Sequence, residues 1–139
     1  MPLRFLLCIA VAGAAWAHDA HGRSNAPTEA RRLKNPLSSP AEHLAAAQRL
    51  YASQCASCHG PDGRARTATA AQLAQRPTDL SNYLMESMKD GEIFWVVKHG
   101  IDSNGQSRMP AFAAALSDHE IWQLVFAVRA LRDQQRAVE

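Results

Sequence analysis

Residues 55–59 read Cys-Ala-Ser-Cys-His, and this stretch decides the fold that we expect for the chain. Cys55 lies three residues before Cys58 and four residues before His59. If the stretch is helical, residues three and four apart lie on the same face of the helix. The two thiols and the imidazole can then all reach one flat group, so three bonds would hold a single cofactor.

The C-x-x-C-H spacing is typical of c-type haem attachment, in which two thiols form thioether bonds to the porphyrin and the histidine binds the iron axially. Two other kinds of site use similar residues. A structural zinc normally needs a fourth ligand, usually from a second Cys/His pair, and none follows in the sequence. A thioredoxin-like dithiol belongs beside a βαβ pattern, whereas this motif ends a helical stretch. The sequence therefore predicts one covalent haem c bound by Cys55 and Cys58, with His59 as an axial iron ligand.

The composition suits one small globular domain. The chain has 139 residues, of which 47% are hydrophobic, so a packed core is possible. The formal net charge of +2 is close to balance. Nucleic-acid binding would show as a clustered basic patch, so we expect no nucleic-acid partner.

Residues 1–17 have the features of a secretory signal peptide. Arg4 supplies an early positive charge, residues 5–15 form an apolar run, and Ala-Trp-Ala at 15–17 is a small-x-small cleavage site. The apolar run is too short to span a bilayer, so we expect no membrane anchor in the mature chain. We expect the protein to be periplasmic, secreted across the inner membrane by this cleaved signal.

The rest of the chain divides into two parts. Residues 18–38 are polar, contain Pro27 and Pro36, and are expected to form a flexible N-terminal segment. Residues 39–139 are expected to form the folded domain. The only cysteine outside the motif, Cys8, lies in the predicted signal peptide, so we expect no disulfide in the mature protein.

Two helices have clear start signals. Ser39-Pro40-Ala41-Glu42 predicts a capping box with proline at the first helical position, and Ser117-Asp118-His119-Glu120 predicts a second capping box. The first helix should end at Gly60. Apolar residues at helical spacing follow each start. They are Leu44, Ala47, Tyr51, Cys55 and Cys58 in the first helix, and Ile121, Leu124, Val125, Val128 and Leu131 in the last, widened by Trp122 and Phe126.

Between these helices we expect a shorter helix and a loop. Asp90 is the predicted N-cap of a helix that ends at Gly100. Residues 101–108 are polar and are expected to form a loop that leads to Met109.

From about Ser39 to Arg132 the chain resembles a class I cytochrome c. Three features in order carry the resemblance: the haem site at residues 55–60, the Met109-Pro110 loop, and a C-terminal helix rich in aromatic residues. The resemblance implies a small all-α fold in which the N- and C-terminal helices cross around one covalently bound haem.

The resemblance also assigns packing residues. Tyr51 fits the aromatic residue of the first helix, and Trp122 and Phe126 fit those of the last. Ala47 stands where the family usually has glycine at the helix crossing, and its methyl group would move the helices slightly apart. In the family a proline carbonyl orients the proximal histidine, and Pro77 is the candidate here.

The resemblance implies a second axial ligand, for which Met109 is the candidate. Met109 lies in a loop fixed by the following proline, 50 residues beyond His59 (109 minus 59), where the family has its ligand. Met85 and Met88 lie in a segment of helical character, where methionine usually fills the core. His99 is another possible ligand, but a cation at a helix C-terminus explains it better.

Three other side chains near the motif bear on a haem. Leu80 is a candidate for lining its pocket. Arg64 and Arg66 are candidates for neutralising its propionates, but charges exposed to solvent are the better explanation of these residues.

Ligation by histidine and methionine occupies both axial positions and leaves no open iron position for a substrate. We therefore expect electron transfer by a periplasmic carrier that is not an enzyme and that exchanges electrons with donor and acceptor proteins. The alternative is a haem c subunit of a periplasmic dehydrogenase or other oxidoreductase complex. A third class, an enzyme or gas sensor, requires that Met109 does not bind the iron.

Overall fold

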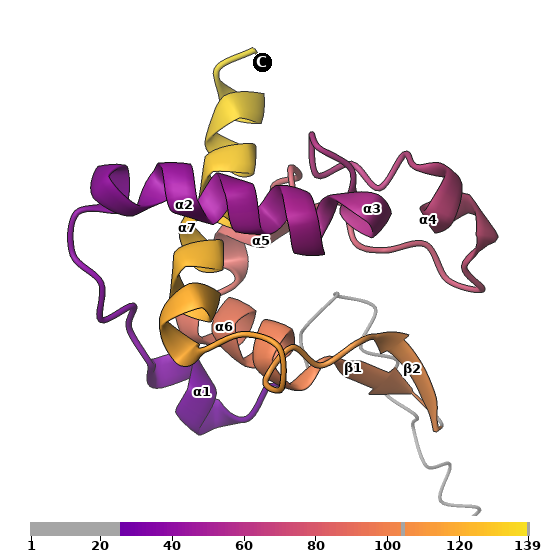
Figure 1. The fold of residues 1–139 in the computed structure, drawn as a ribbon, viewed down its shortest axis with the longest axis horizontal. Helices are drawn as coiled ribbons and strands as arrows, with labels where there is room; N and C mark the ends of the chain where they lie inside the picture. The colour runs from indigo at the N-terminus through magenta and orange to yellow at the C-terminus, as the bar shows by residue number, and fades with distance from the viewer. Residues whose placement is uncertain (1–25, 104, 139) are drawn as a thin grey trace, which may run out of the picture.

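A computed structural model of the chain describes residues 26–103 and 105–138. The predicted signal peptide and residues 18–25 of the predicted flexible segment lie outside this part. The described residues form seven helices and two strands (Figure 1). In chain order they are α1 (Thr28–Arg32), α2 (Pro40–Gln54), α3 (Ala56–His59), α4 (Ala68–Gln72), α5 (Leu84–Ser87), α6 (Asp90–His99), β1 (Ile101–Ser103), β2 (Gln106–Met109) and α7 (Asp118–Arg136). The described part of the chain is therefore mostly helical, as the sequence predicts.

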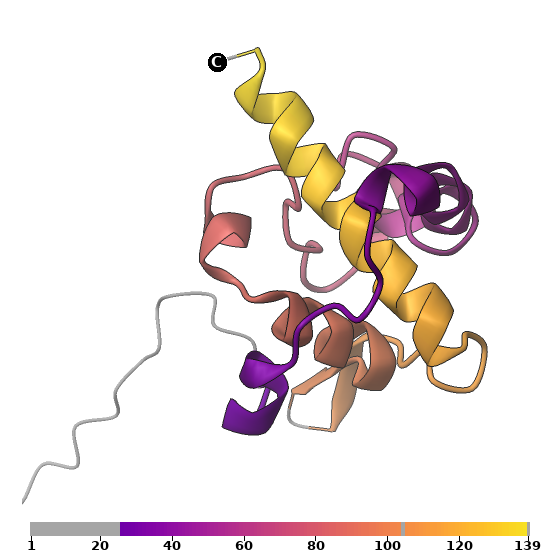
Figure 2. The same ribbon diagram turned by 90° about the vertical axis from the view of Figure 1, so that its left-hand side faces the viewer.

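The two longest helices, α2 and α7, pack against each other. In Figure 1, α2 runs across the view and α7 runs up it, and the two remain adjacent in the rotated view of Figure 2. Ala47 of α2 is fully buried, so the packing accommodates its methyl group. The ring of Phe126 on α7 stacks on His43 of α2, with 6.0 Å between the ring centroids.

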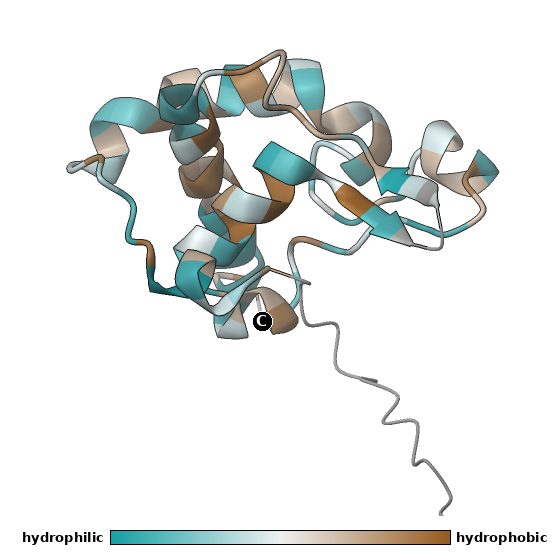
Figure 3. Ribbon diagram, turned by 90° about the horizontal axis from the view of Figure 1, so that it is seen from below, coloured by the Kyte–Doolittle hydropathy of each residue, from teal (hydrophilic) through white to brown (hydrophobic). Residues whose placement is uncertain are grey.

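The apolar stripe predicted for the last helix forms the centre of the core. Ile121, Leu124 and Val125 are the largest fully buried side chains. Hydrophobic and hydrophilic residues alternate along the helices in Figure 3, as amphipathic helices require.

The capping box predicted at the start of α7 is confirmed: the Glu120 N–H donates to the Ser117 hydroxyl at 3.3 Å, and the Ser117 N–H donates to the Glu120 carboxylate at 2.8 Å. Hydrogen bonds from Ser117 lower the pKa of Glu120.

The capping box predicted at the start of α2 is wrong, although the helix does begin with Pro40. Ser39 has a left-handed backbone (φ 59°, ψ 69°), and its side chain makes no capping hydrogen bond. A side-chain cap normally needs an extended backbone at this position. The Ser39 carbonyl instead accepts the Glu42 N–H at 2.9 Å.

The polar loop predicted at residues 101–108 is also wrong. These residues form an antiparallel hairpin of β1 and β2, in which Ile101 pairs with Met109 and Asp102 pairs with Ser107. The described residues are mostly helical, as expected, and the one small sheet is an addition to that expectation. The polar composition does not predict strands because it lacks the alternation of apolar residues that marks a buried strand face.

The segment that we expected to be flexible packs on the domain from residue 26 onward. Ala26 and Ala30 are buried, and α1 contacts α6 (Figure 2). A Cβ atom added at Gly91 of α6 would overlap the carbonyl oxygen of Ala30. The sequence does not indicate this contact, because it depends on the close approach of two small residues, Ala30 and Gly91, which give no hydrophobic periodicity.

Polar contacts hold the same segment. Arg31 forms a salt bridge with Glu92 of α6 at 3.3 Å. The side-chain amide of Asn35 donates to the backbone carbonyl of Trp122 at 3.0 Å. The segment therefore joins α6 to α7 before the chain enters α2.

We predict that Trp122→Ala lowers the free energy of unfolding of the protein by about 3–5 kcal/mol. The indole is 7% exposed and stacks on Phe94 of α6, with 4.1 Å between centroids and 16° between planes. Urea unfolding monitored by far-UV circular dichroism measures the change. Tyr83→Ala is the matched control because Tyr83 is 69% exposed, and it should change stability by no more than about 0.5 kcal/mol. Equal losses in the two variants would show that the stack does not stabilise the fold.

Candidate cofactor site

A cavity of about 430 Å³ lies where α3, α6, α7 and the hairpin meet. Its volume is in the range of about 300–1,000 Å³ that is usual for ligand and cofactor sites. Cys55, Cys58, His59 and Met109 all line it, so the structure brings together the four residues that the sequence singled out. Most of the remaining lining is apolar: Tyr51, Leu73, Pro77, Leu80, Met85, Met88, Ile93, Val96, Val97, Ile101, Pro110, Phe112, Leu124 and Val128.

A short helix presents His59 to this cavity. The helical path bends at Cys55 (φ −117°, ψ −35°), and α3 then ends at His59 before Gly60, which has a positive φ of 79°. The Tyr51 hydroxyl donates to the Gly60 carbonyl at 2.8 Å, and the Ala65 N–H donates to the His59 carbonyl at 2.7 Å. Burial raises the pKa of the Tyr51 hydroxyl, so it stays protonated as a donor. These bonds fix the turn that follows His59.

A backbone carbonyl orients the imidazole. Nδ1 of His59 lies 3.1 Å from the carbonyl oxygen of Thr78, to which it donates its hydrogen. Nε2 is then the nitrogen available to bind a metal. Burial lowers the pKa of His59, which favours the neutral form that metals bind. Pro77 is the residue that the family resemblance predicts for this role, but the accepting carbonyl belongs to the next residue, Thr78.

The two thiols of the motif are half-buried. Burial, with a smaller contribution from Cys58, raises the pKa of Cys55 to about 11. A reactive dithiol needs the opposite shift, since the thiolate is the nucleophile. Among residues 26–103 and 105–138, no three His, Cys, Asp or Glu side chains are grouped to hold a metal ion. The geometry therefore gives no support to the dithiol and zinc alternatives.

Met109 is held by the end of α6. The Phe112 N–H donates to the Val97 carbonyl at 3.1 Å, and the Ala113 N–H donates to the Lys98 carbonyl at 3.2 Å. These two carbonyls belong to the last turn of the helix, where intrahelical partners are missing. Met109 is therefore fixed by strand pairing on one side and by the helix end on the other.

Gly100 allows this close approach, and we predict that Gly100→Ala displaces Met109. The residue has φ 74° and ψ −172°, a combination that is essentially restricted to glycine. A Cβ atom at this position would overlap the Met109 carbonyl oxygen and lie 2.8 Å from the Ala111 nitrogen. Crowding of this kind should lower the free energy of unfolding by about 1–3 kcal/mol beyond the backbone strain itself.

Gly105→Ala is the matched control, measured by the same urea unfolding. Gly105 has a similar φ of 73°, but a Cβ atom there meets no described atom within 4 Å. Equal destabilisation of the two variants would show that backbone strain, and not contact with Met109, explains the loss at Gly100.

Two arginines that no sequence pattern indicates also line the cavity. Arg76 and Arg108 are exposed residues on its lining. Arg64, which we considered for a haem propionate, instead donates to Gln135 of α7, and neither it nor Arg66 is among the described lining residues. A single arginine outside any motif gives no sequence signal of this kind.

The other candidate ligands have different surroundings. His99 is an exposed residue at the C-terminal end of α6, and its ring stacks on Trp95 with 4.7 Å between the centroids. This place in the helix fits the explanation that we preferred to iron binding. Met85 is 3% exposed in the core, as expected for a methionine that fills space. Met85 and Met88 also line the cavity, which sequence spacing did not predict.

The family described as cytochrome C oxidase, cbb3-type, subunit III, matches residues 42–125. This range contains both cysteines, the histidine and Met109. Comparison with curated proteins gives no match. In the described part of the chain, no helix is both long and apolar enough to cross a membrane.

Proposed function

The chain belongs to this c-type cytochrome family, which implies covalently bound haem c, and we propose that it transfers single electrons through one haem attached at Cys55 and Cys58. The bound haem would supply an iron that alternates between the ferrous and ferric states. In this proposal Nε2 of His59 and the thioether of Met109 are the axial ligands. Thr78 orients the imidazole, and the apolar lining keeps water away from the iron.

One observation carries the proposal. Met109 is the last residue of β2, 50 residues after His59 (109 minus 59), yet both line one cavity together with the two cysteines. If a neutral imidazole and a thioether occupied both axial positions, no position on the iron would remain open for a substrate. This supports an electron carrier rather than an enzyme.

The surrounding fold suits the same function. We propose that α2 and α7 are the terminal helices of a class I cytochrome c fold and cross around the haem. Tyr51 of α2 and Leu124 and Val128 of α7 line the cavity, and the two helices are in contact. Arg76 and Arg108 carry the charges that suit the haem propionates.

We further propose a periplasmic location, with residues 1–17 as the cleaved signal peptide, since cytochrome c domains are typically extracytoplasmic. The folded domain then includes residues 26–38 as well as the predicted range from residue 39. Donor and acceptor proteins would exchange electrons with the haem.

A haem c subunit of an oxidoreductase complex is the second candidate function. The description of the matching family, an oxidase subunit, favours it. Purification under native conditions distinguishes the two candidates, because a free carrier elutes alone and a subunit elutes with a larger partner.

Three measurements on the purified protein test the proposal. Haem should remain bound to the polypeptide after acid-acetone extraction, redox titration should show one one-electron transition, and the reduced protein should not bind carbon monoxide readily at neutral pH. Freely extracted haem would disprove covalent attachment. Ready binding of carbon monoxide would favour an enzyme or a gas sensor.

A further inference from the structure

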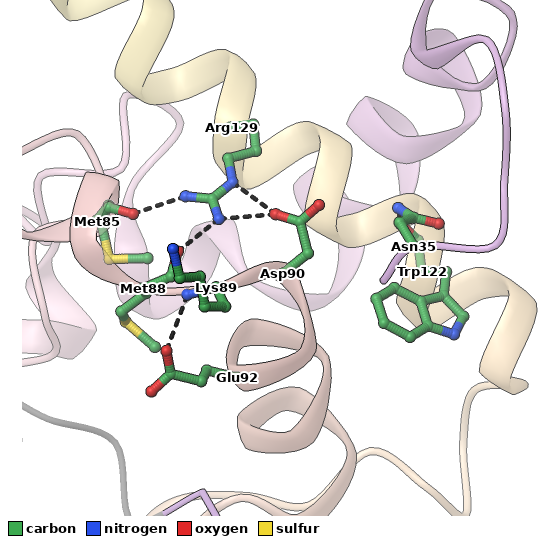
Figure 4. A network of polar contacts seen from close by, with 8 residues as sticks. All are labelled: Asn35, Met85, Met88, Lys89, Asp90, Glu92, Trp122 and Arg129. Carbon is green, nitrogen blue, oxygen red and sulfur yellow. Dashed lines mark hydrogen bonds and ion pairs between the residues drawn. The ribbon is translucent and has the colours of Figure 1, made fainter. Parts of the chain in front are cut away.

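The side chain of Arg129 on α7 makes four hydrogen bonds to one short segment of the chain (Figure 4). Nε and Nη2 donate to one carboxylate oxygen of Asp90, at 2.9 and 2.7 Å. Nη1 donates to the backbone carbonyl of Met85 at 2.6 Å, and Nη2 also donates to that of Met88 at 2.6 Å. The planar guanidinium thus fixes three points between residues 85 and 90.

This segment needs such support because it has little regular structure of its own. The helix α5 has four residues, Leu84–Ser87, and its C-cap, Met88, is already extended (φ −73°, ψ 133°). A helix of a single turn is unstable by itself, because the free-energy cost of fixing its backbone dihedral angles exceeds the gain from its one hydrogen bond. The backbone of residues 85–90 therefore depends on contacts with α7.

The same segment is a wall of the cofactor cavity. The side chains of Met85 and Met88 line the cavity, while their carbonyls accept hydrogen bonds from Arg129. Ile93, one turn into α6 after Asp90, continues this wall. By holding these two carbonyls in place, Arg129 therefore also holds the side chains of Met85 and Met88 against the cavity.

We propose that Arg129 is a positioning residue of the haem site: its guanidinium keeps the wall formed by Met85 and Met88 closed, so that external ligands do not reach the iron. This inference rests on the proposed function. Loss of the planar donor set leaves carbonyls without partners and raises the fraction of molecules in which residues 85–90 have moved outward. The apparent affinity for a small external ligand rises in proportion to that open fraction.

Arg129→Lys tests the proposal because it keeps the positive charge but removes the planar arrangement of donors. Carbon monoxide is the probe, titrated into the reduced holoprotein at neutral pH. We expect Arg129→Lys to bind it about tenfold more tightly than the wild type, which corresponds to about 1.4 kcal/mol. An affinity equal to that of the wild type would overturn the proposal, because charge alone would then be sufficient.

Arg132→Lys is the matched control. Arg132 lies three residues further along α7 and contacts the same short helix, but through the carboxylate of Glu86 at 2.8 Å. It should bind carbon monoxide within about twofold of the wild type. An equal increase in both variants would overturn the proposal, since general loosening of α5 would explain it.

Two further variants keep the outcomes distinct. If Met109→Ala binds carbon monoxide more tightly than the wild type while Arg129→Lys does not, the positioning role of Arg129 is overturned, but the proposal that Met109 binds the iron is supported. If Met109→Ala gains none, the proposed ligand fails, and the inference fails with it. If Arg129→Lys does not fold, Asp90→Asn replaces it, because it removes the charge that orients the guanidinium. A gain in affinity then supports the proposal, and unchanged binding overturns it.

Discussion

Met109→Ala is expected to turn a closed iron site into one that binds carbon monoxide at neutral pH. The methyl group of alanine could not replace the thioether that Met109 would give to the iron, so the variant would leave an iron position free for water or an added ligand. Met109→His should instead keep six-coordinate iron and lower the reduction potential, because the more basic imidazole favours the ferric state. We expect a decrease of roughly 0.1 V or more, within the range of about 0.8 V that axial ligands cover. Potentiometric titration and carbon monoxide titration measure the two effects.

Met85→Leu is the control for this experiment. Met85 lines the same cavity and is 3% exposed, and leucine has a similar volume and apolar character but no sulfur. The reduction potential should match that of the wild type. If instead Met109→Ala behaves as the wild type, Met109 is not the ligand, and Met85, Met88 and His99 become the candidates to test.

The double variant Cys55→Ala with Cys58→Ala is expected to lose covalent haem and most of the folded protein. The cavity of about 430 Å³ is lined largely by apolar side chains, which have no partner atoms without a cofactor. Each 100 Å² of apolar lining that the haem no longer covers costs about 2.5 kcal/mol. The whole stability of a domain is only about 5–15 kcal/mol. A protein without bound haem should therefore unfold at room temperature.

Haem staining after denaturing electrophoresis and far-UV circular dichroism measure the two losses. Ser57→Ala is the control, because Ser57 is the exposed residue directly before Cys58. It should keep both the stained band and the helical spectrum. A double cysteine variant that retains covalent haem would exclude these thiols as the attachment points.

The two capping boxes show how far a local pattern predicts structure. Ser117 and Ser39 stand in the same sequence context, with glutamate three residues later, yet only Ser117 caps its helix. Ser39 follows a segment that is bound to α6 and α7, and it adopts a left-handed backbone as the chain enters α2. A four-residue pattern contains no information about where the preceding chain is held.

The site was predictable to the extent that its chemistry is local. Cys55, Cys58 and His59 are neighbours in sequence, so their spacing was informative before any fold was known. Contacts to backbone carbonyls were not predictable, because every residue has a carbonyl. The roles of Thr78 and Arg129 both depend on such contacts, and only tertiary structure reveals them.

The contact between Ala30 and Gly91 has a consequence for the order of folding. It joins residues 61 positions apart (91 minus 30), so a long loop must close before it forms. In a protein exported N-terminus first, residues 26–38 would emerge early but could not bind until α6 had also crossed the membrane. Resistance of this segment to an added protease would therefore report that translocation of the chain has passed α6, and it should appear late in a pulse-chase experiment.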